Sequence, residues 1–211
     1  SGSITTAGRF AYGILNRGHT NTTTVSGSIT TAGDGAVGIW NIGNENRTTV
    51  SGSIKTEGTA ALGIYNWGDT NITKVSGSIT TAGDKAFGIV NVGSDNTTTV
   101  SGTVSATGTD ASALINLSGS GNSFTLNEGA VIIGDISAGS TSTNNKLKFN
   151  LGASSSYAYT VGGGGAGTGA GQWTFTDQDG RTQGVTSINT SNCTAGPDYD
   201  VYGVVIDGSS L

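Results

Sequence analysis

Residues 26–50 read S-G-S-I-T-T-A-G-D-G-A-V-G-I-W-N-I-G-N-E-N-R-T-T-V, and nearly the same 25 residues occur directly before them and twice directly after them. Four copies therefore start at Ser1, Ser26, Ser51 and Ser76, and a degenerate fifth copy starts at Ser101. Tandem repetition at this period is typical of stacked architectures, in which one unit cannot bury its apolar face alone. We therefore expect an extended binding surface to be more important for function than a pocket.

The stretch that crosses each junction between copies alternates between fixed and varying positions. Charged residues such as Arg47 and Lys55 occur only at the varying positions. Because successive side chains of a strand point to opposite faces, we predict that the fixed register faces inward. At the first junction that register is Asn21, Thr23, Val25, Gly27, Ile29 and Thr31. Its asparagines stand in N-x-T sequons, so surface glycosylation is the alternative to an inward position.

A second strand is expected at about residues 11–18 of each copy. One register of this strand holds Tyr12, Ile14 and Asn16, and we assign it inward because it is apolar or invariant and never charged. The other register, with Ala11 and Gly13, is then outward. A bend at Gly13 that reverses the assignment of its neighbours is the alternative.

Strands that recur at a fixed period should stack on themselves, with about 4.8 Å between turns. The sequence therefore predicts an all-β fold, a parallel β-solenoid of 25-residue turns with irregular C-terminal turns. Like side chains then form ladders, and we expect each asparagine amide to bond to the amides above and below it. The predicted ladders are Ile4, Ile29, Ile54 and Ile79; Ile14, Ile39, Ile64 and Ile89; Asn16, Asn41, Asn66 and Asn91; and Asn21, Asn46, Asn71 and Asn96.

Three segments follow from the repeat pattern. Residues 1–100 hold the four regular repeats, residues 101–151 hold degenerate solenoid turns, and residues 152–211 form an irregular β-rich capping segment with a glycine-rich loop. The fifth copy gains one residue before Leu126. Beyond it we expect strands at about 144–151, 172–176 and 199–207.

The composition excludes some partners. A net charge of −5 without any cluster of Lys or Arg argues against nucleic acid. No apolar run approaches the ~18 residues of a membrane-spanning helix, so we expect no transmembrane segment. The single Cys193 cannot form an internal disulfide, and an inert thiol, an intermolecular bridge and a reactive thiol remain open. Ser1 opens a repeat, so we interpret it as a processed end.

Units of the form S-G-x-I-x-T-x-G-x-x-A-x-G-I-x-N-x-G, followed by L-N-x-G-A-x-I-x-G-x-I near 126–136, resemble the passenger region of bacterial autotransporters. The run N-N-K-L-K-F at 144–149 resembles the end of such a region. The resemblance implies a right-handed parallel β-helix on a Gram-negative cell surface, with an adhesive or structural role. The membrane barrel of that family is missing from this sequence, which implies a cleaved passenger or a relative that works without one.

The sequence offers few residues for catalysis or metal binding. Asp34 and Asp84 would lie ~10 Å apart, a separation that suits an inverting glycosidase, but no second acid–base group accompanies them and solvated turn residues are the favoured reading. His19 is the only histidine, which excludes histidine triads and multi-histidine metal sites. Asp177–Gly180 lacks the distal Glu of a calcium loop, and Gly162–Gly167 matches a phosphate loop only in composition. We therefore predict no enzyme, no metal and no cofactor.

The outward register of the second strand is unusually apolar, and we expect it to form an interface. This predicted stripe holds Leu15, Trp40, Ile42, Tyr65, Trp67, Val90 and Val92, and the alternative is that these residues fill the core. The first turn carries no capping segment, so its edge is a second surface for association.

Together these features predict a secreted, extracellular protein of the bacterial cell surface that is structural and not enzymatic. We expect it to self-associate head-to-tail or laterally, as a filament or surface-layer subunit, or to adhere to a surface glycan or a receptor on a host or neighbouring cell. The alternative is a carbohydrate-binding or carbohydrate-cleaving module that uses surface aromatics such as Trp40, Trp67 and Trp173.

Overall fold

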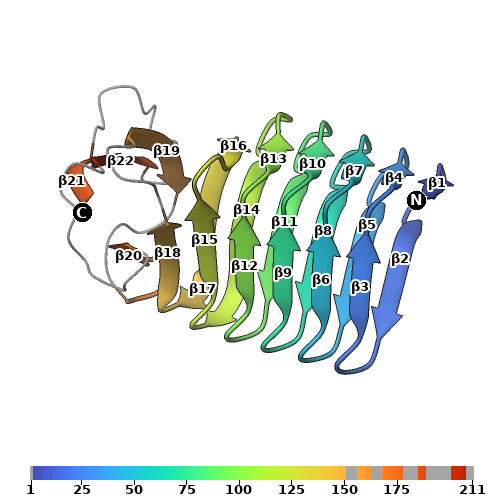
Figure 1. The fold of residues 1–211 in the computed structure, drawn as a ribbon, viewed down its shortest axis with the longest axis horizontal. Helices are drawn as coiled ribbons and strands as arrows, with labels where there is room; N and C mark the ends of the chain where they lie inside the picture. The colour runs from blue at the N-terminus through green and yellow to red at the C-terminus, as the bar shows by residue number, and fades with distance from the viewer. Residues whose placement is uncertain (1, 151–155, 163–167, 178–184, 189–200, 208–211) are drawn as a thin grey trace.

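The computed structural model of the chain describes residues 2–150, 156–162, 168–177, 185–188 and 201–207. Every regular element in this part of the chain is a β-strand, and the strands coil into a parallel β-solenoid, as predicted (Figure 1). Each of the first six turns contributes one strand to each of three sheets, which we call sheets A, B and C. Turn 1 contains β1–β3, and each later turn contains the next three strands through turn 6.

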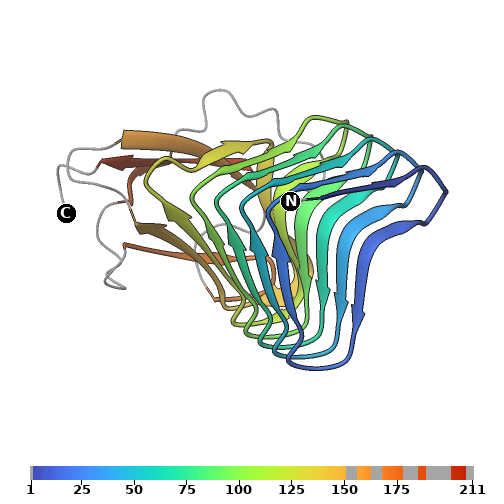
Figure 2. The same cartoon turned by 45° about the vertical axis from the view of Figure 1, so that its right-hand side comes forward.

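The strands of each sheet follow the order of the turns, and each turn pairs in parallel with the next. Sheet A consists of β1 (Ser3–Thr6), β4 (Ser28–Thr31), β7 (Ser53–Thr56), β10 (Ser78–Thr81), β13 (Thr103–Ala106) and β16 (Val131–Ile133). Sheet C consists of β3 (Thr22–Val25), β6 (Arg47–Val50), β9 (Ile72–Val75), β12 (Thr97–Val100), β15 (Ser123–Asn127), β18 (Asn145–Asn150) and β20 (Trp173–Asp177). Figure 2 shows the turns nested one behind another with their bends aligned.

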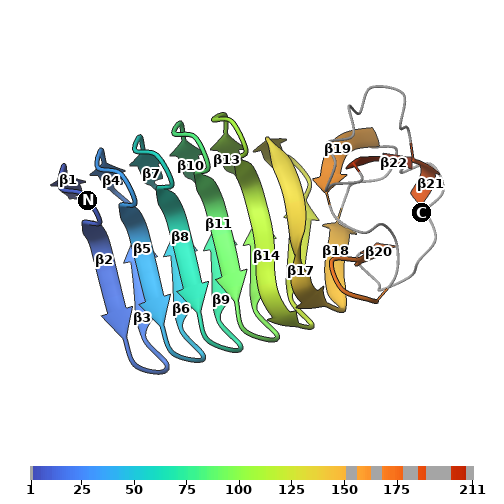
Figure 3. The same ribbon diagram turned by 180° about the vertical axis from the view of Figure 1, so that it is seen from behind.

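Sheet B is the longest sheet, and Figure 3 shows it from its outer side. Its parallel strands are β2 (Tyr12–Arg17), β5 (Val37–Ile42), β8 (Leu62–Trp67), β11 (Phe87–Val92), β14 (Ser112–Ser120), β17 (Asp135–Thr143) and β19 (Ser156–Gly162). Two antiparallel strands, β22 (Val201–Asp207) and β21 (Val185–Ile188), extend it.

The stretch across each junction forms two strands and not one continuous strand. β3 ends at Val25 in sheet C and β4 begins at Ser28 in sheet A, with a bend between them. The glycine of this bend is required because adjacent turns touch there through their backbones. A Cβ atom on Gly77 would lie only 1.9 Å from the carbonyl oxygen of Gly52.

The predicted isoleucine ladders form the core. Ile29 pairs with Ile54 in sheet A and Ile39 pairs with Ile64 in sheet B, so the 25-residue period sets the register. These side chains are at most 1% exposed, and burial of each contributes about 1.5–3 kcal/mol. Phe124, Leu126, Leu147 and Phe149 of turns 5 and 6 extend the same core with larger side chains.

The first asparagine ladder forms as predicted. Nδ2 of Asn41 donates to Oδ1 of Asn66 at 2.8 Å, and Nδ2 of Asn66 donates to Oδ1 of Asn91 at 3.0 Å. The ladder runs from Asn16 to Asn116, and every bond donates toward the next turn. It ends there because turn 6 places Ala138 beside Asn116.

The second asparagine ladder has a different bonding pattern from the predicted one. Oδ1 of Asn71 accepts the backbone N–H of Asn46 at 2.9 Å, and Oδ1 of Asn96 accepts that of Asn71 at 2.9 Å. The amide therefore bonds to backbone and not to the next amide, because these residues sit at the bend, where a backbone N–H points along the coil. Since Asn46, Asn71 and Asn96 are at most 1% exposed, they are ladder residues, and the acceptor asparagines of their sequons are buried.

The extra residue of the fifth copy enters sheet B. Asn91 pairs with Asn116 but Val92 pairs with Ser118, so Leu117 forms a β-bulge. The register then continues with a spacing of 26 residues, as in the bond from the backbone of Asn96 to Oδ1 of Asn122.

Candidate functional site

The favoured prediction for the facing of the second strand is correct after Gly13 and wrong at Gly13 and before it, where the alternative of a bend at Gly13 is confirmed. Ile39 and Asn41 are buried inward, as predicted. However, a Cβ on Gly13 would lie 2.5 Å from Cγ2 of the core residue Ile29, so Gly13 also faces inward. The alternation therefore breaks between residues 13 and 14, where two successive positions point to the core.

The residue before this bend consequently points outward. The ring of Tyr12 lies 5.0 Å from the ring of Trp40, on the outer side of sheet B. Its counterparts Leu62 and Phe87 are half-buried and Val37 is 4% exposed, but none of the three belongs to the core cluster. The predicted inward position of this row was wrong, and so was the outward position of Ala11, whose counterparts Ala36, Ala61 and Ala86 are fully buried.

This correction enlarges the predicted stripe into an apolar face of three rows on sheet B. We define the apolar face by its rows along the coil, which the strand register sets through turn 4, and we include the exposed bulge residue Leu117 with the third row although Val92 pairs with Ser118. The first row is Tyr12, Val37, Leu62 and Phe87, the second is Leu15, Trp40, Tyr65, Val90 and Ile115, and the third is Ile42, Trp67, Val92 and Leu117.

Aromatic rings form the centre of the apolar face. Trp40 stacks with Tyr65 at 5.6 Å and with Trp67 at 6.1 Å between ring centroids. Trp67 is nevertheless 50% exposed, and Leu117, Leu15 and Tyr12 are 37–42% exposed. The face is therefore ordered by contacts among its own side chains. Val37, Val90 and Ile115 are at most 8% exposed, so solvent reaches the face mainly at Trp67, Leu117, Leu15 and Tyr12.

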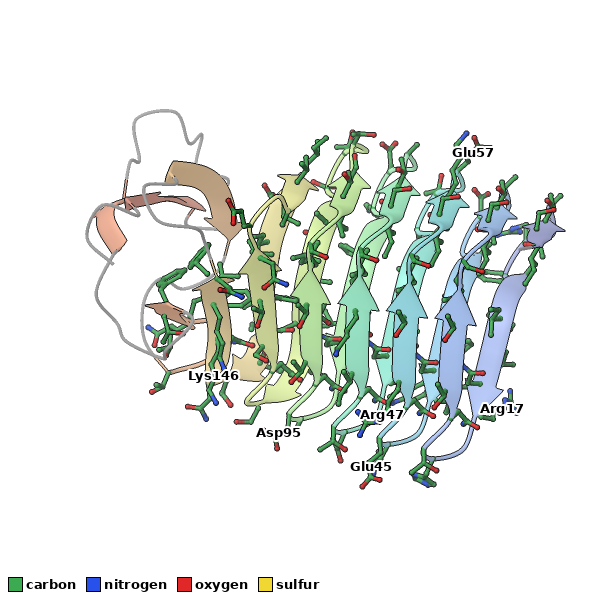
Figure 4. All side chains as sticks on the ribbon, viewed as in Figure 1. Arg17, Glu45, Arg47, Glu57, Asp95 and Lys146 are labelled. Atoms are coloured by element: carbon green, nitrogen blue, oxygen red, sulfur yellow. The ribbon has the colours of Figure 1, made fainter. Side chains whose placement is uncertain are left out.

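The outer faces of the other two sheets are polar. Sheet C points Thr22, Thr24, Thr49 and Lys74 outward, with Ile72 as an isolated apolar residue. Figure 4 shows charged side chains such as Glu45 and Asp95 at the lower bends and Glu57 at the upper bends. Arg17, at the end of β2, is the one charged member of the three rows in turns 1–5. In turns 1–5 the apolar character is thus concentrated on one of the three surfaces, whereas in turn 6 the outer face of sheet A exposes Val131 and Ile133.

Asp135 ends the first row in turn 6, where it pairs with Ser112. Burial raises the pKa of its carboxyl above the ordinary 3.8, because the charged form is poorly solvated there. Its ionisation therefore disfavours folding as the pH rises through the folded-state pKa. We expect Asp135→Asn to raise the melting temperature near pH 7, and the gain to vanish near pH 3, where both side chains are neutral. An equal gain at both pH values would contradict this origin.

The loop residues considered for chemistry have structural roles. Oδ1 of Asp34 accepts the backbone N–H of Thr59, and Oδ1 of Asp84 accepts that of Thr109, each at 2.9 Å. Nδ1 of His19 likewise accepts the backbone N–H of Asn44 at 3.1 Å. In the described part of the chain, no three His, Cys, Asp or Glu side chains lie close enough together to hold a metal ion.

The loop position of His19 carries a ladder that the sequence did not reveal. Oδ1 of Asn44 accepts the backbone N–H of Asp69, and Oδ1 of Asp69 accepts that of Ser94. His, Asn, Asp and Ser differ in charge and size, but each has a hydrogen-bond acceptor. A hydrogen-bond acceptor at the same position of each repeat was the signal for this ladder. The difference in residue type among the four repeats concealed it.

One aromatic residue of the carbohydrate hypothesis does not lie on the surface. Trp173 is 1% exposed and packs against Phe124 at 6.0 Å between ring centroids, so its proposed surface position was wrong. Cys193 and most of the Gly162–Gly167 and Asp177–Gly180 segments lie outside the described residues.

The first turn leaves part of its core open. Ile4 is 38% exposed, and a hollow of about 260 Å³ lies between turns 1 and 2, lined in part by Ile4, Ile14, Val25 and Ile29. Its lining also includes the hydroxyl side chains of Ser3, Thr24, Ser26 and Ser28 but no ionisable side chain, so the hollow is the open end of the solenoid core.

Comparison of the chain with protein-family models, with curated proteins and with solved structures finds no match. Over the described residues, no helix has the length and apolarity to cross a bilayer.

Proposed function

We propose that this protein is a structural β-solenoid that self-associates laterally through the apolar face of sheet B. The observation that carries the proposal is the contrast between the three outer surfaces of one repeat. Across turns 2–4, sheets A and C present Ser, Thr, Lys and Arg with Ile72 as the one apolar side chain, whereas the three rows of sheet B hold only apolar side chains. Exposed apolar patches with aromatic centres are typical of protein interfaces.

The repeated architecture supports a structural role better than a catalytic one. Its polar groups bond to the neighbouring turn, as the side chains of Asp34 and Asn66 do, and so stabilise the coil. The resemblance of the repeat to autotransporter passengers supports a place on the outer surface of a Gram-negative cell. Adhesion to a receptor would use the same apolar face.

Lateral association is favoured over head-to-tail stacking by the ends of sheet B. Stacking of successive copies would need the last turn to present the same parallel edge as the first. In the described residues, sheet B instead ends in the antiparallel strands β22 and β21. The apolar face, by contrast, lies within turns 1–5 and is independent of either end.

We expect the protein to form dimers or larger assemblies as its concentration rises, and Trp67→Ser to weaken this association at least about tenfold. Trp67 is the most exposed aromatic residue of the face, and truncation of a central aromatic anchor typically costs 2 kcal/mol or more. Sedimentation equilibrium up to several hundred micromolar measures the effect.

Ile72→Ser is the matched control, because Ile72 is a half-buried apolar residue on the outer side of sheet C. Its association should equal that of the wild type. A wild type that stays monomeric throughout, or equal association of the Trp67→Ser variant, would contradict the proposal. Circular dichroism and urea unfolding establish that both variants fold.

A second candidate function is binding of an insoluble polysaccharide by the same face, and the cluster of Trp40, Tyr65 and Trp67 favours it. Aromatic rings present large, rigid apolar surfaces on which sugar rings can pack. Retention of a monomeric wild type on cellulose, chitin or peptidoglycan, lost in Trp67→Ser but kept in Ile72→Ser, would favour this candidate over self-association.

A further inference from the structure

Turn 1 leaves one edge of all three sheets without a neighbouring strand. β1, β2 and β3 are the outermost strands of sheets A, B and C in the described part of the chain (Figure 3). In turn 2 the backbone N–H groups of Val37 and Arg47 donate to carbonyls of turn 1 at 2.9 and 2.8 Å. The equivalent N–H groups of turn 1, those of Tyr12 and Thr22, meet no turn in the described residues. Such a row of unpaired backbone groups is a template for strand addition.

The same edge leaves the isoleucine ladders unfinished. Ile4 is 38% exposed and Ile14 is half-buried, whereas Ile29 and Ile39, one turn further along, are at most 1% exposed. The hollow of about 260 Å³ lies beside these two side chains. One further isoleucine in each ladder would cover them, as turn 1 itself covers the isoleucines of turn 2.

The asparagine ladders give this edge a defined hydrogen-bonding polarity. In turn 2, Oδ1 of Asn41 accepts from Nδ2 of Asn16 at 2.7 Å, and Oδ1 of Asn46 accepts from the backbone N–H of Asn21 at 3.0 Å. The corresponding acceptors of turn 1 are Oδ1 of Asn16 and Oδ1 of Asn21, and no turn of the described chain supplies their donors. An occupant of the edge must therefore bring a side-chain amide donor and a backbone donor at these two places.

We propose that the edge of turn 1 binds a turn of another polypeptide chain that carries the same 25-residue repeat, and that this segment folds on the edge in parallel register. The contact would repeat the one that already joins each pair of successive turns. It would supply backbone partners to three strands, one isoleucine to each ladder and one donor to each asparagine acceptor. Turn 1 would thus be a binding site for repeat segments, separate from the apolar face.

Neither end of a second folded copy meets these requirements. Two turn 1 edges placed together would bring acceptors against acceptors, because both asparagine ladders end there in Oδ1. At the other end of the ladder, Ala138 of turn 6 lies beside Asn116 and offers no amide donor. Sheet B also continues there into the antiparallel strands β22 and β21. The occupant is therefore a separate repeat segment and not a whole copy docked end to end.

The sequence of residues 76–100 has the groups that this edge requires. Within the chain, Nδ2 of Asn91 donates to Oδ1 of Asn116 at 3.0 Å, and the same group of a bound segment would donate to Oδ1 of Asn16. Oδ1 of Asp84 likewise accepts a backbone N–H of the following turn at 2.9 Å. The two isoleucines of the segment extend the two isoleucine ladders. A synthetic peptide of residues 76–100 is therefore a suitable probe.

Titration of the full-length chain with this peptide tests the inference. A segment that folds on binding loses conformational entropy and binds weakly, so the titration extends to about 1 mM peptide. We expect the N–H groups of Tyr12 and Thr22 to exchange with deuterated solvent at least about tenfold more slowly when the peptide is bound, because each gains a carbonyl acceptor. Nuclear magnetic resonance of the labelled chain with unlabelled peptide measures both binding and exchange.

The matched control is the same peptide with Asn91→Asp. Aspartate has nearly the size of asparagine, but it replaces the Nδ2 donor by a second oxygen, which would face Oδ1 of Asn16. We expect this peptide to bind at least about tenfold more weakly. Equal binding of the two peptides would overturn the inference. Absence of binding, or binding without slower exchange at Tyr12 and Thr22, would overturn it as well.

Two substitutions of isoleucine locate the site on the protein. Ile4→Asp places a carboxylate at the open end of the core, and we expect it to weaken peptide binding at least about tenfold because the bound turn would bury that charge. Ile72→Asp makes the same change on the outer side of sheet C in turn 3, and it should bind the peptide as the wild type does. Equal binding by the two variants would contradict the proposed position of the peptide.

This inference does not depend on lateral association. Trp67→Ser alters the apolar face and leaves the edge of turn 1 intact, so it should bind the peptide as the wild type does. Loss of peptide binding in Trp67→Ser would place the peptide on the apolar face and overturn the inference. A wild type that binds the peptide at turn 1 but stays monomeric would support this inference and overturn the proposed function.

Discussion

Gly77→Ala should destabilise the protein by about 3 kcal/mol or prevent folding, because overpacking against backbone cannot be relieved by a rotamer change. The added Cβ would lie 1.9 Å from the carbonyl oxygen of Gly52 and 2.7 Å from the carbonyl carbon of Ser51. Relief requires the bend to move away from the preceding turn, and that movement breaks the hydrogen bond from Ser78 N–H to the Gly52 carbonyl. Urea unfolding followed by circular dichroism measures the change.

Gly2→Ala is the matched control for this prediction. Gly2 occupies the same position of the repeat in turn 1, but no atom lies within 4 Å of the site of its added Cβ. The intrinsic effect of replacing glycine by alanine is therefore present in both variants, whereas the clash with the preceding turn is present only in Gly77→Ala. Equal unfolding midpoints for the two variants would show that contact between turns does not determine the need for glycine.

Asn66→Ala should destabilise the protein by about 3 kcal/mol, since it removes the middle of the first asparagine ladder. Asn66 is fully buried, donates to Oγ1 of Thr73 and Oδ1 of Asn91, and accepts from Nδ2 of Asn41. Alanine would leave the buried Oδ1 of Asn91 without its donor, and each such unsatisfied group costs about 1–3 kcal/mol. A small cavity adds to this cost.

The same substitution at Asn16 should cost only about 1 kcal/mol. Asn16 makes equivalent bonds to Oγ1 of Thr23 and Oδ1 of Asn41, but it is only partly buried at the edge of turn 1, where water can replace it. Urea unfolding of both variants under one condition checks the difference. A cost at Asn66 no larger than at Asn16 would rule out burial of unpaired groups as the cause.

The stacking of turns could be predicted from the sequence because a single period fixes it. Once residues 26–50 are aligned with residues 51–75, the pairing of Ile29 with Ile54 and of Asn41 with Asn66 follows without further information. The inward register of the junction strands could also be predicted, since alternation there is regular and charged residues occur in only one register.

The row of Tyr12 was misplaced because strict alternation was assumed through Gly13. The inward bend at this glycine depends on close packing with Ile29 and with the Gly38 carbonyl, which periodicity alone does not show. A signal was nonetheless present. Ala11 and Gly13 are invariant in the four regular repeats, whereas position 12 varies from Val to Tyr, and a ladder inside a closely packed core favours constant size.

The bonding of the second asparagine ladder could not be predicted from residue types. The sequence shows that Asn46 and Asn71 are stacked, but whether Oδ1 meets an amide or a backbone N–H depends on the direction of the chain at the bend. The break of glycine periodicity at Ala113 has a similar origin. Ser112 pairs with Asp135 and Leu114 pairs with Ile136, so Ala113 lies in a bulge and its Cβ need not pass the carbonyl group that each earlier glycine faces.

The uniform direction of the first asparagine ladder gives the coil an electrical polarity. The amide dipoles from Asn16 to Asn116 point the same way and add along the axis, with an acceptor exposed toward turn 1 and a donor group, Nδ2 of Asn116, buried at the other end. Reversal of any one amide would place two donors or two acceptors face to face on both sides of it. The orientations of the ladder amides are therefore coupled, so that one amide can reverse only if all of them reverse.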